Sequence, residues 1–406
     1  MAKLKTTPNP NELRRSIEGY AAVLNFSKKI FFKEGPEFAA LSKILIRFPG
    51  FDEMSEQDIV DFVIGETFAV AWTNTDSNPM SQELVEHFIS AVNSIPRQYS
   101  LVVHLPAAPD WGTYRIDLGG GVALAADAST LEGVPLLQEQ GINALQKAML
   151  PERHSGHATF LEIQTRGYAG FSYTSRLFAE AFSRLKQLSF LLRNDGVFSQ
   201  TSPSVAQTRA LVTDRLSNRK IFPQLPHAIE RLTMTIAPNP KALTLGLPKG
   251  EDPFGLFEVT GKELVASLEK HLASCRRFFS SEGSTHHDSV AAAMEWYFDS
   301  LTNDNQTLAY LSACIGLEAL LHYSSTKDEM MSEMTKRISD RYAYMLADTK
   351  DDRIRLMQEM TSVLRQRGEL VHARERRLTP GAFRLLESAR RMLKECIAHE
   401  LQPLIR

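Results

Sequence analysis

The sequence predicts a multidomain protein in which an α+β N-terminal region precedes an all-helical C-terminal bundle. At 406 residues the chain exceeds one core of typical size, which suggests two or three domains. Helical and strand-like patterns alternate over residues 1–285, whereas apolar residues recur at helical spacing from Asp288 onwards. Hydrophobic residues make up 43% and charged residues 23% of the chain, as in soluble globular proteins.

Four segments of the N-terminal region have the pattern of helices. Asn11–Asn25 is amphipathic and begins with an asparagine suited to capping. Ser55–Glu66 and Ser81–Ile95 each begin with a serine close to acidic residues. Thr174–Arg193 predicts a longer helix.

Strands are expected in the same region. A hairpin is predicted where Tyr114–Leu118 and Val122–Ala126 flank Gly119-Gly120-Gly121. This glycine run is read as a turn and not as a phosphate-binding loop, because no Gly-Lys-Ser/Thr follows it. Further strands are predicted at Phe68–Trp72, Tyr99–Leu105, Ala158–Ile163 and Leu232–Ile236.

Composition changes mark the expected domain boundaries. Ile221–Glu251 is rich in proline, and Ser280–His287 is polar and flexible in composition. We therefore predict an α+β N-terminal region at 1–285, with two subdomains dividing near 130–155, and a helical domain at 286–406.

The C-terminal domain is predicted to contain five helices. Their apolar stripes are typical of a helical bundle. They are expected at Asp288–Leu301, Asp304–Tyr323, Asp328–Leu346, Asp351–Val371 and after Thr379-Pro380, which supplies an N-cap and an N1 proline.

Charge and cysteine content exclude several classes of protein. The net charge of −2 gives no global basic field, so nucleic-acid binding would need a local patch. Cys275, Cys314 and Cys396 are far apart, which favours buried thiols in a reducing cytoplasm over a disulfide framework. The N-terminus lacks the apolar stretch of a signal peptide, and no apolar run approaches the about 20 residues of a membrane span. We expect a cytoplasmic protein without membrane association.

One stretch near the end of the chain combines a titratable group with fixed cations. Histidine changes charge near neutral pH, and arginine binds phosphate oxygens, so the combination suits a phosphate-containing polymer. The stretch holds His372 among Arg365, Arg367, Arg374, Arg376 and Arg377.

Three segments in this region occur in a recognisable order. Leu317-Glu318-Ala-Leu-Leu321 lies in an apolar helix, Glu333–Leu346 follows with Arg341, and Arg367-Gly-Glu-Leu-Val-His372 comes last. Over residues 290–402 the chain resembles the Apea-like branch of the HEPN superfamily, whose hallmark is Arg-x4-6-His late in a helical bundle. Many HEPN domains are endoribonucleases that need no metal or cofactor and act as homodimers.

The resemblance implies that Arg367 and His372 form a catalytic pair. The RNA 2′-OH would attack the adjacent phosphorus and leave a 2′,3′-cyclic phosphate. The protein would then be an antiviral or toxin effector, and residues 1–285 would be a sensor or regulatory region that binds a phage or host trigger. The alternative is a non-catalytic HEPN scaffold that dimerises and binds RNA, a nucleotide or a protein partner.

Helical geometry leaves the identity of the working arginine open. Five steps of about 100° place Arg367 and His372 about 140° apart on a straight helix. Seven steps bring Arg365 onto the face of His372, unless the helix departs from regularity at Gly368. Glu369, one turn before the histidine, could orient the imidazole or neutralise Arg365.

The other candidate residues are assigned supporting roles. A buried carboxylate needs a partner, so we expect Glu318 to pair with an arginine inside the bundle, and Glu318 and Arg341 to be structural. Outside the catalytic pair, Arg365, Arg374, Arg376 and Arg377 are expected to contact phosphate. No metal site is expected at His154-Ser-Gly-His157, and His286-His287-Asp288 is interpreted as a linker with an N-cap.

Overall fold

The computed structural model describes much of the chain. The described residues are 9–24, 34–51, 54–73, 81–105, 115–125, 159–168, 176–194, 198–199, 210–214, 220–221, 237–238, 265–321 except 267 and 271, 331–372, and 377–406 except 380 and 382.

Four N-terminal helices pack around an apolar core of their own. They are α1 (Pro10–Val23), α2 (Pro36–Leu45), α3 (Glu56–Thr73) and α4 (Ser81–Asn93). The cap of α1 is Asn9, two residues earlier than predicted, and its side chain accepts the Asn11 amide at 2.9 Å. The strand predicted at Phe68–Trp72 is wrong, because these residues continue α3. A short apolar run without alternation cannot be distinguished from a buried helix by periodicity.

An antiparallel sheet follows, in the strand order β2-β3-β4-β1-β6-β7. Its strands are β1 (Arg97–Leu105), β2 (Arg115–Gly119), β3 (Val122–Ala125), β4 (Thr159–Gly167), β6 (Ala210–Asp214) and β7 (Lys220–Ile221). A separate pair joins β5 (Phe198–Ser199) to β8 (Ala237–Pro238). The β2–β3 hairpin is confirmed, and its three glycines have φ of 84°, 56° and 73°, a region that disfavours other residues. The strand predicted at Leu232–Ile236 lies outside the described residues.

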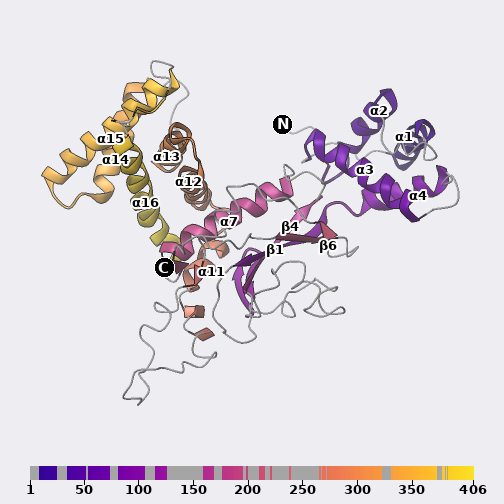
Figure 1. Ribbon diagram of the computed structural model, residues 1–406, viewed down its shortest axis with the longest axis horizontal. Coiled ribbons are helices and arrows are strands. Elements are labelled where there is room, and N and C mark those ends of the chain that lie inside the picture. The colour runs from indigo at the N-terminus through magenta and orange to yellow at the C-terminus, as the bar shows by residue number, and fades with distance from the viewer. Residues whose placement is uncertain are drawn as a thin grey trace, which may run out of the picture.

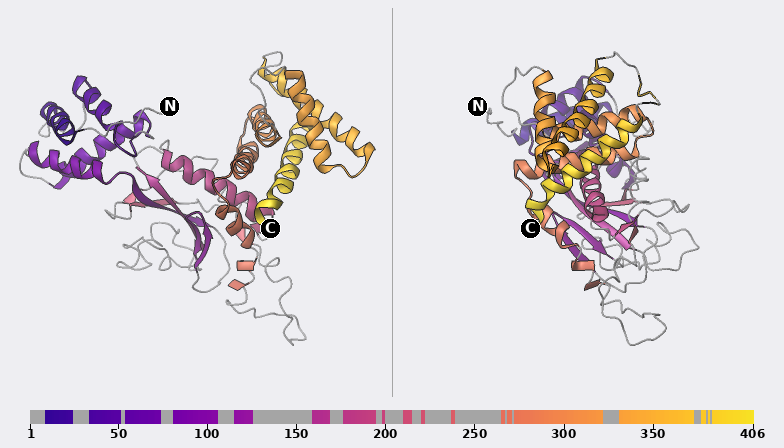
Figure 2. Two further views of the ribbon diagram at one scale, coloured as in Figure 1. Left: turned by 180° about the vertical axis from the view of Figure 1, so that it is seen from behind. Right: turned by 90° about the vertical axis from the view of Figure 1, so that its left-hand side faces the viewer.

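Helices α7 (Arg176–Asn194) and α11 (Ala273–Ser280) connect the sheet to the C-terminal helices. One apolar cluster runs from sheet residues such as Leu161, through Leu188 and Phe278, to the C-terminal helices. Packing is therefore continuous across the predicted boundary at 285/286. Figures 1 and 2 show α1–α4 at one end of the molecule and the C-terminal helices at the other.

The polar segment before the C-terminal helices is a short turn. Ser284 caps the next helix, and its hydroxyl accepts the His287 amide at 3.1 Å. His286-His287-Asp288 therefore form the first turn of that helix, which corrects their interpretation as a linker with an N-cap.

The C-terminal part of the chain is helical, as predicted. Its helices are α12 (Thr285–Thr302), α13 (Gln306–Leu321), α14 (Met331–Leu346), α15 (Lys350–Val371) and α16 (Phe383–Ile405). Close packing of α13 depends on Gly316, where an added Cβ would lie 2.6 Å from Leu393 Cδ2 and 3.0 Å from Trp296 Cβ. In the part of the chain that the structure describes, no helix has the length and apolarity needed to cross a membrane.

Candidate active site

The Arg-x4-His motif lies on the last turns of α15. The helix begins at Lys350 and is capped by Thr349, whose hydroxyl accepts the Asp352 amide at 3.2 Å, with acidic residues in its first turn. It ends at Val371, and the backbone N–H of the capping residue His372 donates to the Gly368 carbonyl at 3.0 Å. The helix is continuous through Gly368, so the irregularity that would bring Arg367 beside His372 does not occur within the chain.

Continuous helix places Arg365, and not Arg367, on the face of His372. Seven steps of about 100° leave Arg365 and His372 about 20° apart around the axis. Both residues are exposed to solvent. Arg367 lies about 140° away from His372 and faces the interior of the bundle.

Arg367 forms an ion pair with Glu318 of α13. The Arg367 Nη2 and Glu318 Oε2 atoms are 3.0 Å apart, and the two side chains are only 20% and 18% exposed. The expected partner of Glu318 is therefore an arginine of the motif itself. Arg341 lies elsewhere: it donates to the Leu321 carbonyl and to Glu400 Oε1, both at 3.4 Å.

Two further polar residues lie on the same face of α13: Tyr310 was not singled out from the sequence, and Cys314 was predicted only as a buried thiol. Tyr310, Cys314 and Glu318 follow at intervals of four residues, which aligns them on a helix. The hydroxyl of Tyr310, which is fully buried, donates to the carbonyl of Val363 in α15 at 2.5 Å. Burial raises the pKa of the Tyr310 phenol and raises the pKa of the Cys314 thiol to about 12, so both stay protonated at neutral pH. Their four-residue spacing with Glu318 is the signal that could have placed them on its face.

The remaining basic residues of the stretch are only partly described. Arg377 is exposed, whereas Arg374 and Arg376 lie outside the described residues. The amide of Leu378 donates to Thr307 Oγ1 at 2.9 Å and anchors the segment that follows α15 to the start of α13. Glu369 is half-buried, one turn before the histidine.

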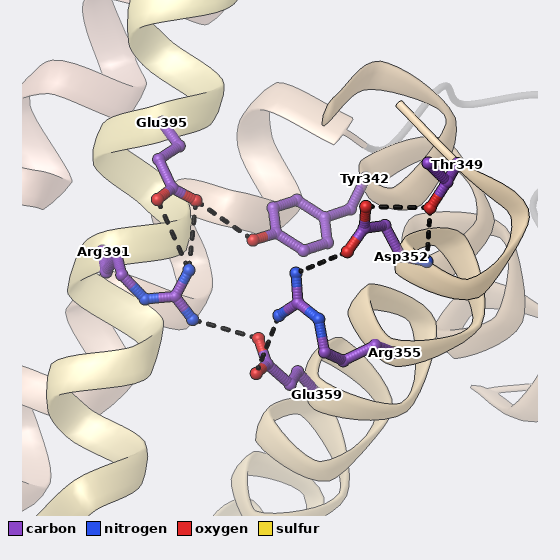
Figure 3. Close-up of polar contacts among 7 residues, drawn as sticks. All are labelled: Tyr342, Thr349, Asp352, Arg355, Glu359, Arg391 and Glu395. Carbon is purple, nitrogen blue, oxygen red and sulfur yellow. Dashed lines mark hydrogen bonds and ion pairs between the residues drawn. The ribbon is translucent and has the colours of Figure 1, made fainter. Parts of the chain in front are cut away.

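A polar network links another part of α15 to α16, and α16 in turn to α14 (Figure 3). Arg391 of α16 lies 3.0 Å from Glu359 and 3.3 Å from Glu395. The Tyr342 hydroxyl donates to Glu395 at 3.2 Å. The network comprises Tyr342, Thr349, Asp352, Arg355, Glu359, Arg391 and Glu395. Most of its ion pairs join residues of one helix, whereas Arg391–Glu359 joins α16 to α15 and Tyr342–Glu395 joins α14 to α16. The network therefore holds neighbouring helices together.

Metal-ligating clusters are absent among the described residues. His154 and His157 lie outside those residues. The three cysteines are buried free thiols, as expected.

Comparison with known proteins adds no relative: no family model, no curated protein and no solved structure matches this chain. The function is therefore argued from the residues and geometry of α13 and α15.

Proposed function

We propose that the chain is a metal-independent endoribonuclease of the HEPN type, with His372 and Arg365 on its reactive face. The observation that carries this proposal is that His372 is exposed at the end of a continuous helix, and that Arg365, seven residues earlier on the same face, is exposed as well. Ordered bundle packing beneath α15 supports it, because a catalytic group must be held rigidly.

The chemistry needs only groups that this face carries. The 2′-OH of RNA is the nucleophile, and it attacks the adjacent phosphorus while the 5′-oxygen of the next nucleotide departs. An imidazole can take the proton from the 2′-OH or deliver one to the leaving oxygen. A guanidinium stabilises the charge that develops on the phosphoryl oxygens. The products are a 2′,3′-cyclic phosphate and a 5′-OH.

A homodimer completes the proposed site. Acid–base catalysis of this reaction uses one group to accept a proton and another to donate one, and the stretch contains a single histidine. Two α15 ends facing one another would supply both, while Arg374, Arg376 and Arg377 would contact flanking phosphates. In this proposal the N-terminal region binds a phage or host trigger, and the protein acts as an antiviral or toxin effector.

The test compares Arg365→Gln, His372→Ala and the double variant in RNA cleavage. Each single substitution should lower kcat by about 100-fold or more. Since the two groups act as a unit, the double variant should be little slower than the slower single variant. Arg384→Gln, an exposed arginine of α16, is the matched control and should cleave like the parent. Parent-like cleavage by Arg365→Gln would remove Arg365 from the proposed site.

A second candidate function is a HEPN scaffold that dimerises and binds RNA, a nucleotide or a protein without cleaving RNA. The observation that favours it is the ion pair of Arg367 with Glu318, which engages the motif arginine within the bundle. This candidate predicts that parent and His372→Ala proteins sediment alike, bind RNA alike and leave it intact.

A further inference from the structure

We infer that Tyr310 and Glu318 of α13 are positioning residues that fix the rotation of α15 about its axis and thereby orient His372 and Arg365. The inference rests on the proposed function for its catalytic consequence, and on the contacts between α13 and α15 for its geometry.

Two attachment points lie one turn apart on the inward side of α15. The Tyr310 hydroxyl donates to the Val363 carbonyl at 2.5 Å, and Glu318 binds Arg367 at 3.0 Å. Val363 and Arg367 are four residues apart, or about 6 Å along the helix. A single contact lets a helix pivot, whereas two contacts on one side resist both sliding and rotation.

The first attachment reaches the backbone of α15. A side-chain contact can follow a moving helix by changing its rotamer, but the Val363 carbonyl moves with the helix itself. Tyr310 has no exposed surface, and its raised pKa keeps the hydroxyl a donor at physiological pH. Rotation of α15 by one residue, or about 100°, would move a backbone atom by about 3.5 Å at a helix radius of about 2.3 Å. Such a rotation would break the hydrogen bond from Tyr310 to Val363.

Small rotations matter at the outer face. Side chains end about 6 Å from the axis, so a rotation of about 10° displaces the tip of His372 by about 1 Å. A displacement of that size can lower a catalytic rate by about 100-fold. Tyr310 and Glu318 therefore act on catalysis through α15 without touching the substrate.

The chain offers a matched control for the loss of a buried tyrosine hydroxyl. Tyr342 is also fully buried with a raised pKa, but its hydroxyl donates to the Glu395 side chain of α16 and not to α15. Tyr310→Phe and Tyr342→Phe each remove one buried hydroxyl and differ in the helix that it contacts.

The experiment uses the full chain in three forms: parent, Tyr310→Phe and Tyr342→Phe. RNA cleavage gives kcat and KM separately, and the ring resonance of His372 in carbon-13-labelled protein, assigned with His372→Ala, reports its surroundings. We expect Tyr310→Phe to lower kcat about tenfold with KM unchanged and to shift the His372 resonance, while Tyr342→Phe changes neither.

Equal losses of kcat in both tyrosine variants, or no change in Tyr310→Phe, would overturn the inference. If the parent cleaves no RNA, the proposed nuclease function fails, and the His372 ring resonance alone tests the positioning role. A shift in Tyr310→Phe only would then still support positioning, and the absence of a shift would overturn it.

Discussion

The Glu318–Arg367 ion pair gives the most quantitative prediction about the bundle. At the observed separation of 3.0 Å, two unit charges attract by about 5–6 kcal/mol at an effective dielectric constant of about 20. Both side chains keep about a fifth of their surface exposed, and burying the charges costs much of that attraction. We therefore expect a coupling free energy of about 1–2 kcal/mol, above the usual value for exposed pairs.

The assay is a double-mutant cycle with Glu318→Gln, Arg367→Gln and both together. Urea unfolding followed by far-ultraviolet circular dichroism gives the free energy of unfolding of each protein. Each single variant leaves one charge half-buried without its partner, so the double variant should lose about 1–2 kcal/mol less than the sum of the two.

A matched cycle on Arg14 and Glu86 provides the control. Their atoms are 2.6 Å apart but the side chains are 39% and 55% exposed, so the coupling should stay below about 0.5 kcal/mol. Equal coupling energies in the two cycles would refute the argument that burial makes the Glu318–Arg367 pair the stronger one.

Three further predictions concern packing, surface charge and the thiols. Gly316→Ala should destabilise the protein by about 1–3 kcal/mol because its Cβ would overlap neighbouring side chains. Gly19→Ala, with no atom within 4 Å of the new Cβ, should instead raise the melting temperature. A higher melting temperature for Gly316→Ala than for Gly19→Ala would contradict the packing. Arg391→Gln should lower the free energy of unfolding by about 0.5 kcal/mol in low salt and by less in high salt, while Arg384→Gln should change it by nothing measurable. A loss of stability that does not depend on salt would count against the network in Figure 3. Burial raises the pKa of Cys314 from 9.0 to about 12, so its thiol should resist thiol reagents until the protein unfolds. Because the thiol ionises at lower pH in the unfolded chain, the parent should lose stability faster than Cys314→Ala as pH rises above about 9. Equal losses of stability in the two proteins would exclude this linkage.

Helix and hairpin positions were predictable because their signals are local. Apolar spacing predicted α4 and the five C-terminal helices, although α16 begins at Phe383 and not directly after the predicted cap Thr379, and the glycine run predicted the β2–β3 turn. The error at Phe68–Trp72 arose because an apolar run of five residues fits a buried helix as well as a strand. Local pattern does not decide between them when more than one side of the segment is buried.

The arrangement at the candidate site depends on tertiary contacts that spacing alone does not give. The sequence implied that Glu318 needs an arginine, but only packing of α13 on α15 selects Arg367 over Arg341. The conformation at Gly368 was likewise open, because glycine permits a break without requiring one. Its helical conformation is what separates Arg367 from His372.

Continuity of the core is a second feature that composition could not reveal. The polar segment before α12 has the composition of a linker, yet it is a turn, and apolar residues of α11 before it and of α12 after it belong to one core. Polar composition shows that a segment is exposed; it does not show whether the elements it joins share a core.

RNA cleavage by the parent and His372→Ala proteins in EDTA tests the central claim most directly. The account predicts that the parent cleaves and leaves 2′,3′-cyclic phosphate ends, and that His372→Ala, with unchanged circular dichroism, is slower by about 100-fold or more. Equal cleavage by the two proteins, or loss of parent activity in EDTA, would contradict the claim that His372 performs metal-independent catalysis.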